Sequence, residues 1–164
     1  GGSNPPAPTP NVGFQSPWVV QAHHVEPRRV NSLIVEDNPG HQRLTEHALR
    51  RNRVPVSCTV VRDGQEVLDY LSGKPPCDDA VRGPRPDLIL LDLNLPRRDG
   101  REVLGIILGD PSLRDIPIVI VSTSDREEDV RFALDLGARA YISKSRGFDK
   151  FSEAISEVFK YASK

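Results

Sequence analysis

The strongest constraint on the fold is the run of four aliphatic residues Leu88–Leu91, which Asp92 ends. An unbroken apolar run of this length is typical of a strand that is buried on both faces in a parallel sheet. Pro96, Asp99 and Gly100 follow and predict a short loop. We therefore expect Asp92 at the carboxyl end of a central strand, where open α/β sheets place their ligand sites.

The other apolar segments alternate between strand and helix patterns. β-branched and aliphatic runs predict strands over Val30–Val35, Val56–Val61, Ile116–Val121 and Ala140–Ser143. Apolar residues at helical spacing predict helices after Asn38, around Val67–Leu71, over Val103–Leu108, over Val130–Leu136 and from Phe148 to the C-terminus. This order predicts the α/β class, with a doubly wound parallel sheet of five strands and helices on both faces.

The connections and the N-terminal segment carry few aliphatic residues. Asp63-Gly64 predicts a turn, and the Pro-rich residues 73–86 predict a long loop before the third strand. Residues 1–28 are rich in proline, which predicts a disordered tail ahead of one domain over residues 29–164. With 164 residues, the chain is long enough to bury a core of its own.

Charge and targeting signals limit the classes of partner. The 22 basic and 23 acidic residues give a net charge of −1, so electrostatics offers no case for nucleic acid as the main partner. No apolar run is long enough to span a membrane, and no signal-peptide pattern is present. Cys58 and Cys77 show no metal-ligand spacing, and we expect reduced thiols in a cytoplasmic protein.

Polar side chains stand at the ends of four predicted strands. They are Glu36 and Asp37, Asp92 and Asn94, Ser122, and Lys144. Parallel strands end at one edge of a sheet, so three carboxylates would meet there and repel unless one is protonated or a cation joins them. Oxygen ligands with several waters suit Mg²⁺ better than zinc. With a lysine and a hydroxyl beside them, these residues fit phosphoryl transfer onto a carboxylate.

Two histidines on the first predicted helix are not expected to take part. His41 and His47 are six residues apart and therefore lie on different helix faces. We expect both to be solvated rather than to act as ligands.

With these residues in view, residues 29–162 resemble the receiver domain of response regulators. The resemblance implies a flavodoxin-like fold with strand order 2-1-3-4-5. Glu36-Asp37 resembles the acidic pair of the family, Asp92 its phosphoacceptor, and Asn94 the residue whose backbone carbonyl binds the metal. Ser122 matches the hydroxyl position, Tyr141 the aromatic switch and Lys144 the family lysine.

The resemblance also implies a mechanism. A sensor histidine kinase presents a phosphohistidine, and Asp92 attacks it with Mg²⁺ held by Asp37, Asp92 and the carbonyl of Asn94, while Glu36 acts through a bound water. Lys144 pairs with the phosphoryl group and Ser122 shifts to bond it. Tyr141 then turns inward and remodels the face of helix four, strand five and helix five. No separate substrate is turned over, so the chain is not expected to be an enzyme.

The residue after Lys144 departs from the family pattern. Most receivers have a proline there, after a cis peptide bond, whereas this chain has Ser145. A non-proline cis bond costs roughly 3–4 kcal/mol, so either the surrounding structure holds it or the loop is rebuilt.

Within the family, the chain resembles stand-alone receivers, because no DNA-binding output segment is recognisable. The long loop before the third strand, the segment Asp92–Pro96 and the pair Lys144-Ser145 resemble receivers that are paired with bacterial phytochromes. Such receivers often dimerise through the face of helix four, strand five and helix five. The expected partners are therefore a sensor kinase such as a bacteriophytochrome, and a second copy of the chain.

Two other functions stay open from the sequence. A Mg²⁺-dependent aspartyl phosphatase would use two acids spaced Asp-x-Asp, but Asn94 holds the second position and is no carboxylic acid. The other open function is a receiver-like dimeric scaffold that never takes phosphate.

The apolar stripe Phe148–Phe159 is expected mainly in the core, with part left exposed for a dimer. Tyr141 is equally compatible with ordinary sheet packing.

Overall fold

The structure is a computed structural model that describes residues 29–73 and 84–163. The predicted tail over residues 1–28 and most of the predicted loop over residues 73–86 lie outside this part of the chain. The elements run in the order β1 (Val30–Val35), α1 (Pro39–Arg50), β2 (Val56–Val61), α2 (Gly64–Ser72), β3 (Leu88–Leu91), α3 (Gly100–Gly109), β4 (Ile118–Ser122), α4 (Glu127–Leu136), β5 (Ala140–Ser143) and α5 (Phe148–Val158). Two 3-10 helices, Lys144–Arg146 and Phe159–Ser163, flank α5.

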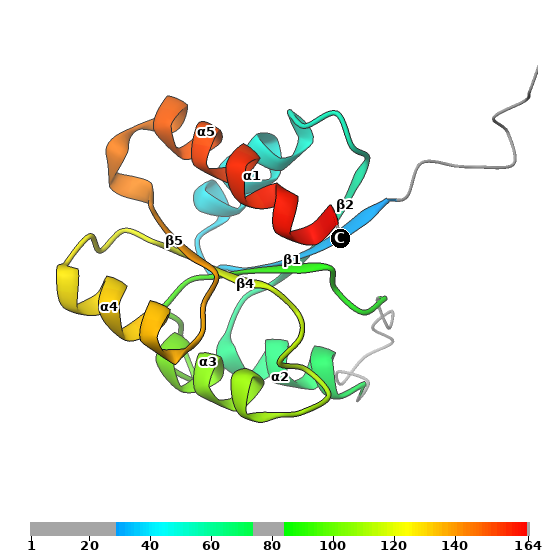
Figure 1. Ribbon diagram of the computed structural model, residues 1–164, viewed down its shortest axis with the longest axis vertical. Coiled ribbons are helices and arrows are strands. Elements are labelled where there is room, and N and C mark those ends of the chain that lie inside the picture. The colour runs from blue at the N-terminus through cyan, green and yellow to red at the C-terminus, as the bar shows by residue number, and fades with distance from the viewer. Residues whose placement is uncertain (1–28, 74–83, 164) are drawn as a thin grey trace, which may run out of the picture.

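The five strands form one parallel sheet in the order β2-β1-β3-β4-β5. Figure 1 shows α1 and α5 on one side of this sheet and α2, α3 and α4 on the other. The predicted fold class and strand order are therefore confirmed. Right-handed crossovers between parallel strands produce this doubly wound arrangement, and they bring the carboxyl ends of all five strands to the same edge.

Four strands have the predicted bounds, but the predicted fourth strand was wrong at both ends. It starts at Ile118 because the N–H of Ile116 donates to the carbonyl of Leu113 at 3.0 Å in a preceding turn. It ends at Ser122, which pairs with Ser143 of β5.

The predicted turn at Asp63-Gly64 was also wrong. Gly64 is the first residue of α2, and the Asp63 side chain caps that helix by accepting from the N–H groups of Gln65 and Glu66 at 2.9 and 2.8 Å.

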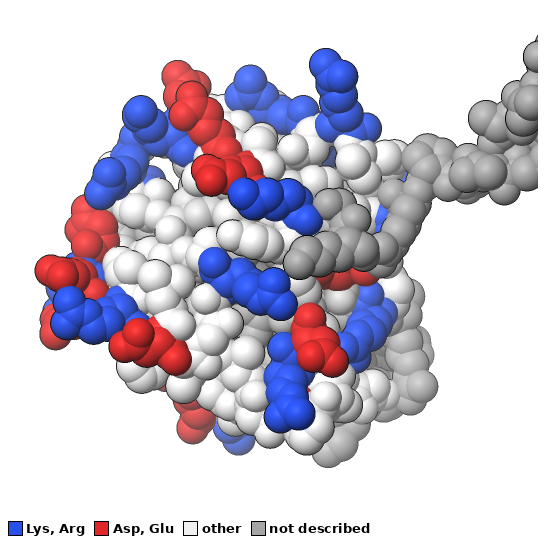
Figure 2. Space-filling view, in the orientation of Figure 1, with Lys and Arg blue, Asp and Glu red and all other residues white. Residues whose placement is uncertain are grey.

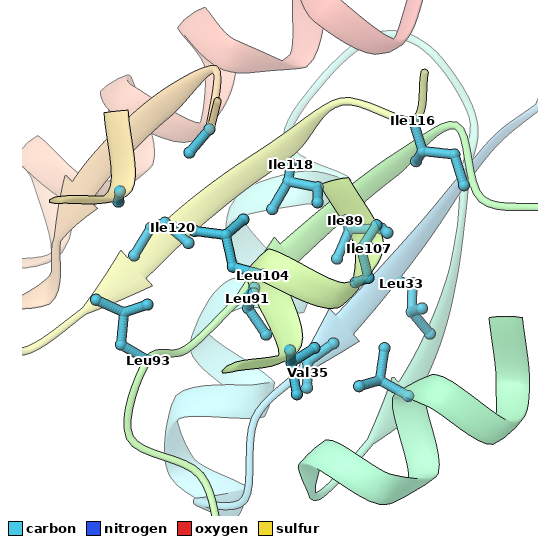
Figure 3. Close-up of a cluster of buried hydrophobic side chains, with 14 of the residues drawn as sticks. Leu33, Val35, Ile89, Leu91, Leu93, Leu104, Ile107, Ile116, Ile118 and Ile120 are labelled. Carbon is cyan, nitrogen blue, oxygen red and sulfur yellow. The ribbon is translucent and has the colours of Figure 1, made fainter. Parts of the chain in front are cut away.

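Alternate residues of the strands fill two apolar layers. Leu33 and Val35 of β1 belong to the layer under α2, α3 and α4, whereas Ile34 belongs to the layer under α1 and α5. Figure 3 shows the first layer, in which Leu104 and Ile107 of α3 lie over the sheet residues. In the second layer, the stripe of α5 is buried, with Phe151, Ile155, Val158 and Phe159 in the core. This confirms core packing for the stripe and leaves it little exposed surface.

The surface has mixed charge on the face that Figure 2 shows. Lys and Arg side chains lie among Asp and Glu side chains there, so this face has no broad area of one sign. Across residues 29–73 and 84–163, no helix is long and apolar enough to cross a membrane.

Gly100 lets the start of α3 pack against the loop that follows β3. Its N–H donates to the carbonyl of Leu93 at 2.9 Å. A Cβ atom at this position would overlap the carbonyl oxygen of Asp92 and the Cα of Leu93. Because both contacts are to backbone, no side-chain rotation would relieve the overlap. The close approach therefore fixes the backbone around Asp92.

We predict that Gly100→Ala lowers the free energy of unfolding by at least about 2 kcal/mol, since overpacking against rigid backbone is costly. Gly105→Ala in the same helix is the matched control. A Cβ there meets only Leu136, at 4.0 Å. That variant should gain up to about 1 kcal/mol, because alanine is the better helix former. Urea denaturation of the two variants measures both values, and equal stabilities would contradict the close approach.

Candidate functional site

The register of the sheet places the predicted site residues at one edge. Val35 pairs with Leu91, so Glu36 and Asp92 follow neighbouring positions on β1 and β3. The N–H of Asp92 donates to the carbonyl of Val35 at 3.1 Å. On the other side of β3, Ser122 closes β4, and Lys144 directly follows β5. Residues that are more than a hundred positions apart in the sequence therefore meet.

Three carboxylates form a group at this edge. Glu36, Asp37 and Asp92 each offer an oxygen, and these oxygens lie within 4.8 Å of one another. Glu36 and Asp92 are buried, at 3% and 7% exposure, whereas Asp37 is exposed. Backbone N–H groups hold the buried pair, because Asn38 donates to Glu36 Oε2 at 3.2 Å and Asn94 donates to Asp92 Oδ1 at 2.9 Å. The group is thus open to solvent on the side of Asp37.

Lys144 supplies the positive charge beside these acids. Its side chain is only 3% exposed, and Nζ donates to Asp92 Oδ2 at 3.1 Å and to Glu36 Oε1. The lysine begins a 3-10 helix, in which the N–H of Ser145 donates to Ser143 Oγ at 3.2 Å. No peptide bond of the described chain is cis. Of the two predicted alternatives, the rebuilt loop is therefore the one found.

His41 is part of the site, and the prediction of a solvated side chain was wrong. Its Nδ1 lies 3.1 Å from Lys144 Nζ and 3.8 Å from Glu36 Oε1. Burial, and then the charge of Lys144, lower the pKa of His41, so the neutral form of the ring is favoured and its Nδ1 can accept a hydrogen bond from the ammonium group. The sequence feature that could have placed His41 near the site is the helix cap at Asn38. The Asn38 side chain accepts from the N–H of His41 at 3.1 Å, which places this histidine in the first turn of α1.

His47 faces a different neighbour, as its spacing predicted. Its ring lies 5.5 Å from the ring of Phe148 on α5. The side chain is exposed, as predicted, and it lies against α5 instead of beside the acidic group.

Burial controls the electrostatics of Glu36. Desolvation raises the pKa of this carboxyl group, while the hydrogen bond and the charge of Lys144 lower it and the nearby Asp92 raises it again. The ionised form of Glu36 is therefore destabilised relative to the protonated form even with Lys144 in place. Binding of a further cation, or of a proton, would lower the free energy of this group of carboxylates.

Ser122 and Tyr141 meet at a neighbouring point instead of among the carboxylates. Ser122 is fully buried, and its Oγ accepts from the N–H of Ser124 at 3.1 Å. The hydroxyl of Tyr141 donates to the carbonyl of Ser124 at 2.8 Å, while its ring packs against the core. Both predicted switch residues therefore form a hydrogen bond with the main chain of Ser124.

This arrangement has the parts that phosphoryl transfer to a carboxylate needs. Asp92 is a carboxylate at a strand end that could act as a nucleophile, Lys144 can neutralise an incoming anion, and the oxygens of Glu36 and Asp37 beside them could hold a divalent ion.

Comparisons with known proteins identify the family to which the chain is similar. The sequence model of the response regulator receiver domain matches residues 32–156. Response regulator Rcp1 of Synechocystis sp. is 40% identical over 126 residues, which cover 77% of this chain and 84% of the relative. The crystal structure of its Mn(2+)-bound form superposes with a TM-score of 0.70 at 35% identity, over 79% of this chain and 91% of that one. The phosphorylated cyanobacterial phytochrome response regulator RcpA gives a TM-score of 0.71 at 40% identity, over 82% and 94%.

We predict that Lys144→Met lowers the free energy of unfolding by about 3 kcal/mol at neutral pH in a chelating buffer, because two buried carboxylates lose their counter-charge. The exposed Lys150 on α5 offers a control of the same chemistry, and Lys150→Met should change stability little.

The sign of the pH dependence follows from Glu36. A carboxyl group whose pKa is raised on folding binds its proton first in the native state, so acidification favours that state down to the ordinary pKa of about 4.5. The deficit of Lys144→Met should therefore shrink as the pH falls from neutral towards this value. Denaturation series at several pH values measure it, and a constant deficit would mean that the carboxylates are not its source.

Proposed function

Since this chain belongs to the family of response regulator receiver domains of two-component systems, we propose that Asp92 accepts a phosphoryl group from a phosphohistidine on a sensor histidine kinase. The observation that carries the proposal is the position of Asp92. Its carboxylate lies at the end of the central strand β3, where it accepts a hydrogen bond from Lys144 and has an oxygen within 4.8 Å of oxygens of Glu36 and Asp37.

The chemistry assigns a task to each residue around Asp92. A carboxylate oxygen of Asp92 forms the new P–O bond while the P–N bond of the phosphohistidine breaks, and the histidine nitrogen keeps the electron pair. The N–H of Asn94 holds Oδ1 of Asp92 in place. Lys144 turns part of its hydrogen bonding from the carboxylates to the phosphoryl oxygens, so the added charge meets a cation already in the pocket.

Mg²⁺ is the proposed cofactor, held by Asp37, Asp92 and the backbone carbonyl of Asn94, with Glu36 acting through water. The residues fit a hard cation, because all three side chains offer oxygen and one of them is open to solvent. When bound, the ion neutralises charge on the carboxylates and on the phosphoryl group. Rcp1, a relative, has been crystallised in a Mn(2+)-bound form.

The proposed response runs through Ser122 and Tyr141 to the face formed by α4, β5 and α5. Ser122 shifts to hydrogen-bond the phosphoryl group, and Tyr141, whose ring already packs partly against the core, moves further inward. A shallow groove on this face supports the proposal, because Tyr141 lines it together with Val130 of α4 and Ala154 of α5. A change at Tyr141 would alter this groove directly.

The proposed partners are a sensor kinase and a second copy of the chain. A bacteriophytochrome is the proposed kinase, supported by similarity to RcpA and to the bacteriophytochrome response regulator AtBRR, at 40% and 38% identity. The dimer is proposed through α4, β5 and α5. The stripe of α5 gives it no support, because that stripe is buried, but Leu134 of α4 is 44% exposed. The proposal places the protein in the cytoplasm, with no role for nucleic acid or membrane.

Two alternatives compete with this function. Receiver domains are typically not enzymes with a separate substrate, and Asn94 leaves an aspartyl phosphatase without its second acid. A dimeric scaffold without phosphotransfer would need no complete acidic group, whereas this chain has one joined to a buried lysine.

We predict that the full chain gains one phosphoryl group on incubation with acetyl phosphate and Mg²⁺, as measured by intact mass spectrometry. Asp92→Asn should gain none, and chelation of the metal should slow the wild-type reaction strongly. No gain on the wild type, or an equal gain on Asp92→Asn, would support the scaffold. Sustained release of phosphate from small phosphomonoesters would support the phosphatase.

The dimer is tested by sedimentation velocity with and without phosphorylation. We predict reversible self-association that Leu134→Lys weakens, because a charge would replace apolar contact area. Leu136→Lys on the same helix is the control, since Leu136 lies on the flank that faces Gly105 of α3. A monomer at all concentrations in both states would rule out the dimer.

A further inference from the structure

Lys144 reaches the carboxylates with a long side chain that is held at both ends. Its backbone directly follows β5 and begins a 3-10 helix, in which Ser143 Oγ accepts from the N–H of Ser145 at 3.2 Å. At the other end the ammonium group is buried, since the side chain of Lys144 is only 3% exposed. A long flexible stem connects the two ends. The direction of the N–H groups therefore depends on what the ammonium group contacts.

Three acceptors surround this ammonium group, and each comes from a different part of the fold. Nζ donates to Glu36 Oε1 at the end of β1, and to Asp92 Oδ2 at the end of β3 at 3.1 Å. The third acceptor is Nδ1 of His41, which lies 3.1 Å away in the first turn of α1. An ammonium group has three N–H bonds and no lone pair, so each hydrogen has one acceptor here.

The contact between His41 and Lys144 has a definite direction. Because Nζ can only donate, Nδ1 of His41 is the acceptor, and the neutral ring then carries its proton on Nε2. The position of the histidine is set by α1, since the side chain of Asn38 accepts from the N–H of His41 at 3.1 Å. The acceptor is thus placed by a helix cap that does not depend on the loop of Lys144.

We propose that His41 is a positioning residue that sets the direction of the Lys144 ammonium group, so that one of its N–H bonds points at Asp92 for an incoming phosphoryl group. The inference rests on the proposed function, because it takes Asp92 as the residue that gains the phosphoryl group. Of the three acceptors, His41 is the one that neither reacts nor belongs to the proposed metal site.

The physical reason lies in what happens to the other acceptors. When an oxygen of Asp92 bonds to phosphorus, the carboxylate loses its charge and becomes a weaker acceptor, so the N–H that pointed at it is available for a phosphoryl oxygen. His41 keeps another N–H occupied and thereby limits rotation about the Cε–Nζ bond. Without this acceptor, the ammonium group can turn towards Glu36 or bind a water molecule. Orientation of a charged donor before the reaction lowers the barrier to transfer.

The kinetic test is phosphorylation of the full chain by acetyl phosphate with Mg²⁺, in which the P–O bond of the donor breaks and acetate leaves with the electron pair. We expect His41→Leu to slow this reaction roughly tenfold, since a charge-assisted hydrogen bond is misdirected. His47→Leu, which changes the second histidine of α1, should leave the rate unchanged.

Two conservative variants separate positioning from a general loss of structure. His41→Asn keeps an acceptor oxygen as many bonds from the backbone as Nδ1, and it should restore most of the wild-type rate. His41→Gln places its oxygen one bond further out and should react as slowly as His41→Leu. A structural role of the side chain alone would not separate asparagine from glutamine in this way.

A spectroscopic measurement tests the contact without any phosphorylation. In the ¹⁵N-labelled free chain in chelating buffer, the Nζ–H signal of Lys144 should be visible, because three acceptors and burial slow its exchange with water. Lys144→Met assigns the signal by removing it. We expect faster exchange in His41→Leu and His41→Gln, and slow exchange in His41→Asn and His47→Leu.

The outcomes distinguish this inference from the proposed function. If the wild type is phosphorylated on Asp92 and His41→Leu reacts as fast, or His41→Asn as slowly as His41→Leu, the positioning role is overturned while the phosphoacceptor stands. Equal exchange of the Lys144 signal in the wild type and His41→Leu, or no such signal in the wild type, also overturns it. If the wild type gains no phosphoryl group, or Asp92→Asn gains one equally, the proposed function fails and the positioning role fails with it.

Discussion

The contact of the Lys144 ammonium group with two buried carboxylates is the interaction on which the site depends. Glu36 and Asp92 leave water because parallel strands end side by side, and burial of unpaired charge is among the most costly events in folding. Lys144 directly follows β5, which lies two strands and about 10 Å away from β3. A long side chain is needed to reach from the end of β5 past β4 to Asp92 and Glu36. The ion pairs of Lys144 with Glu36 and Asp92 thus connect the edge strand β5 to the central strands β1 and β3.

Residues 29–73 and 84–163 include two buried acidic centres with opposite properties. At Glu36, burial outweighs the donors, so the pKa of the carboxyl group rises and the pocket favours a further cation. At Asp129 of α4, three hydrogen-bond donors outweigh burial, so the pKa falls and the carboxylate needs nothing more. The first centre is suited to bind and react, whereas the second is suited to hold a loop. Ser124 lies between them, since its backbone contacts Ser122 and Tyr141 while its side chain contacts Asp129.

The sequence predicted the sheet and the acidic group because both depend on short patterns. The run Leu88–Leu91 sets a buried strand, and the polar residues at the ends of four strands reach one edge by topology alone. Contacts set by side-chain direction were not predictable in this way. His41 reaches Lys144 only because the cap at Asn38 fixes the first turn of α1. Asp129 reads as an ordinary acid in the first turn of a helix, and nothing in its spacing shows that Arg101 of α3 lies against it. The start of β4 was misplaced because Ile116 is apolar, yet it closes a turn.

The most direct measurement of the central claim is to locate the modified residue chemically. An acyl phosphate on an aspartate is reduced by borohydride to homoserine, which peptide mapping by mass spectrometry identifies. After incubation with acetyl phosphate and Mg²⁺, we predict homoserine at position 92 and unmodified side chains at Glu36 and Asp37. Homoserine at position 37, a phosphoryl group on any other residue, or no conversion at all would contradict a site in which Lys144 and the neighbouring acids prepare Asp92 to receive phosphate.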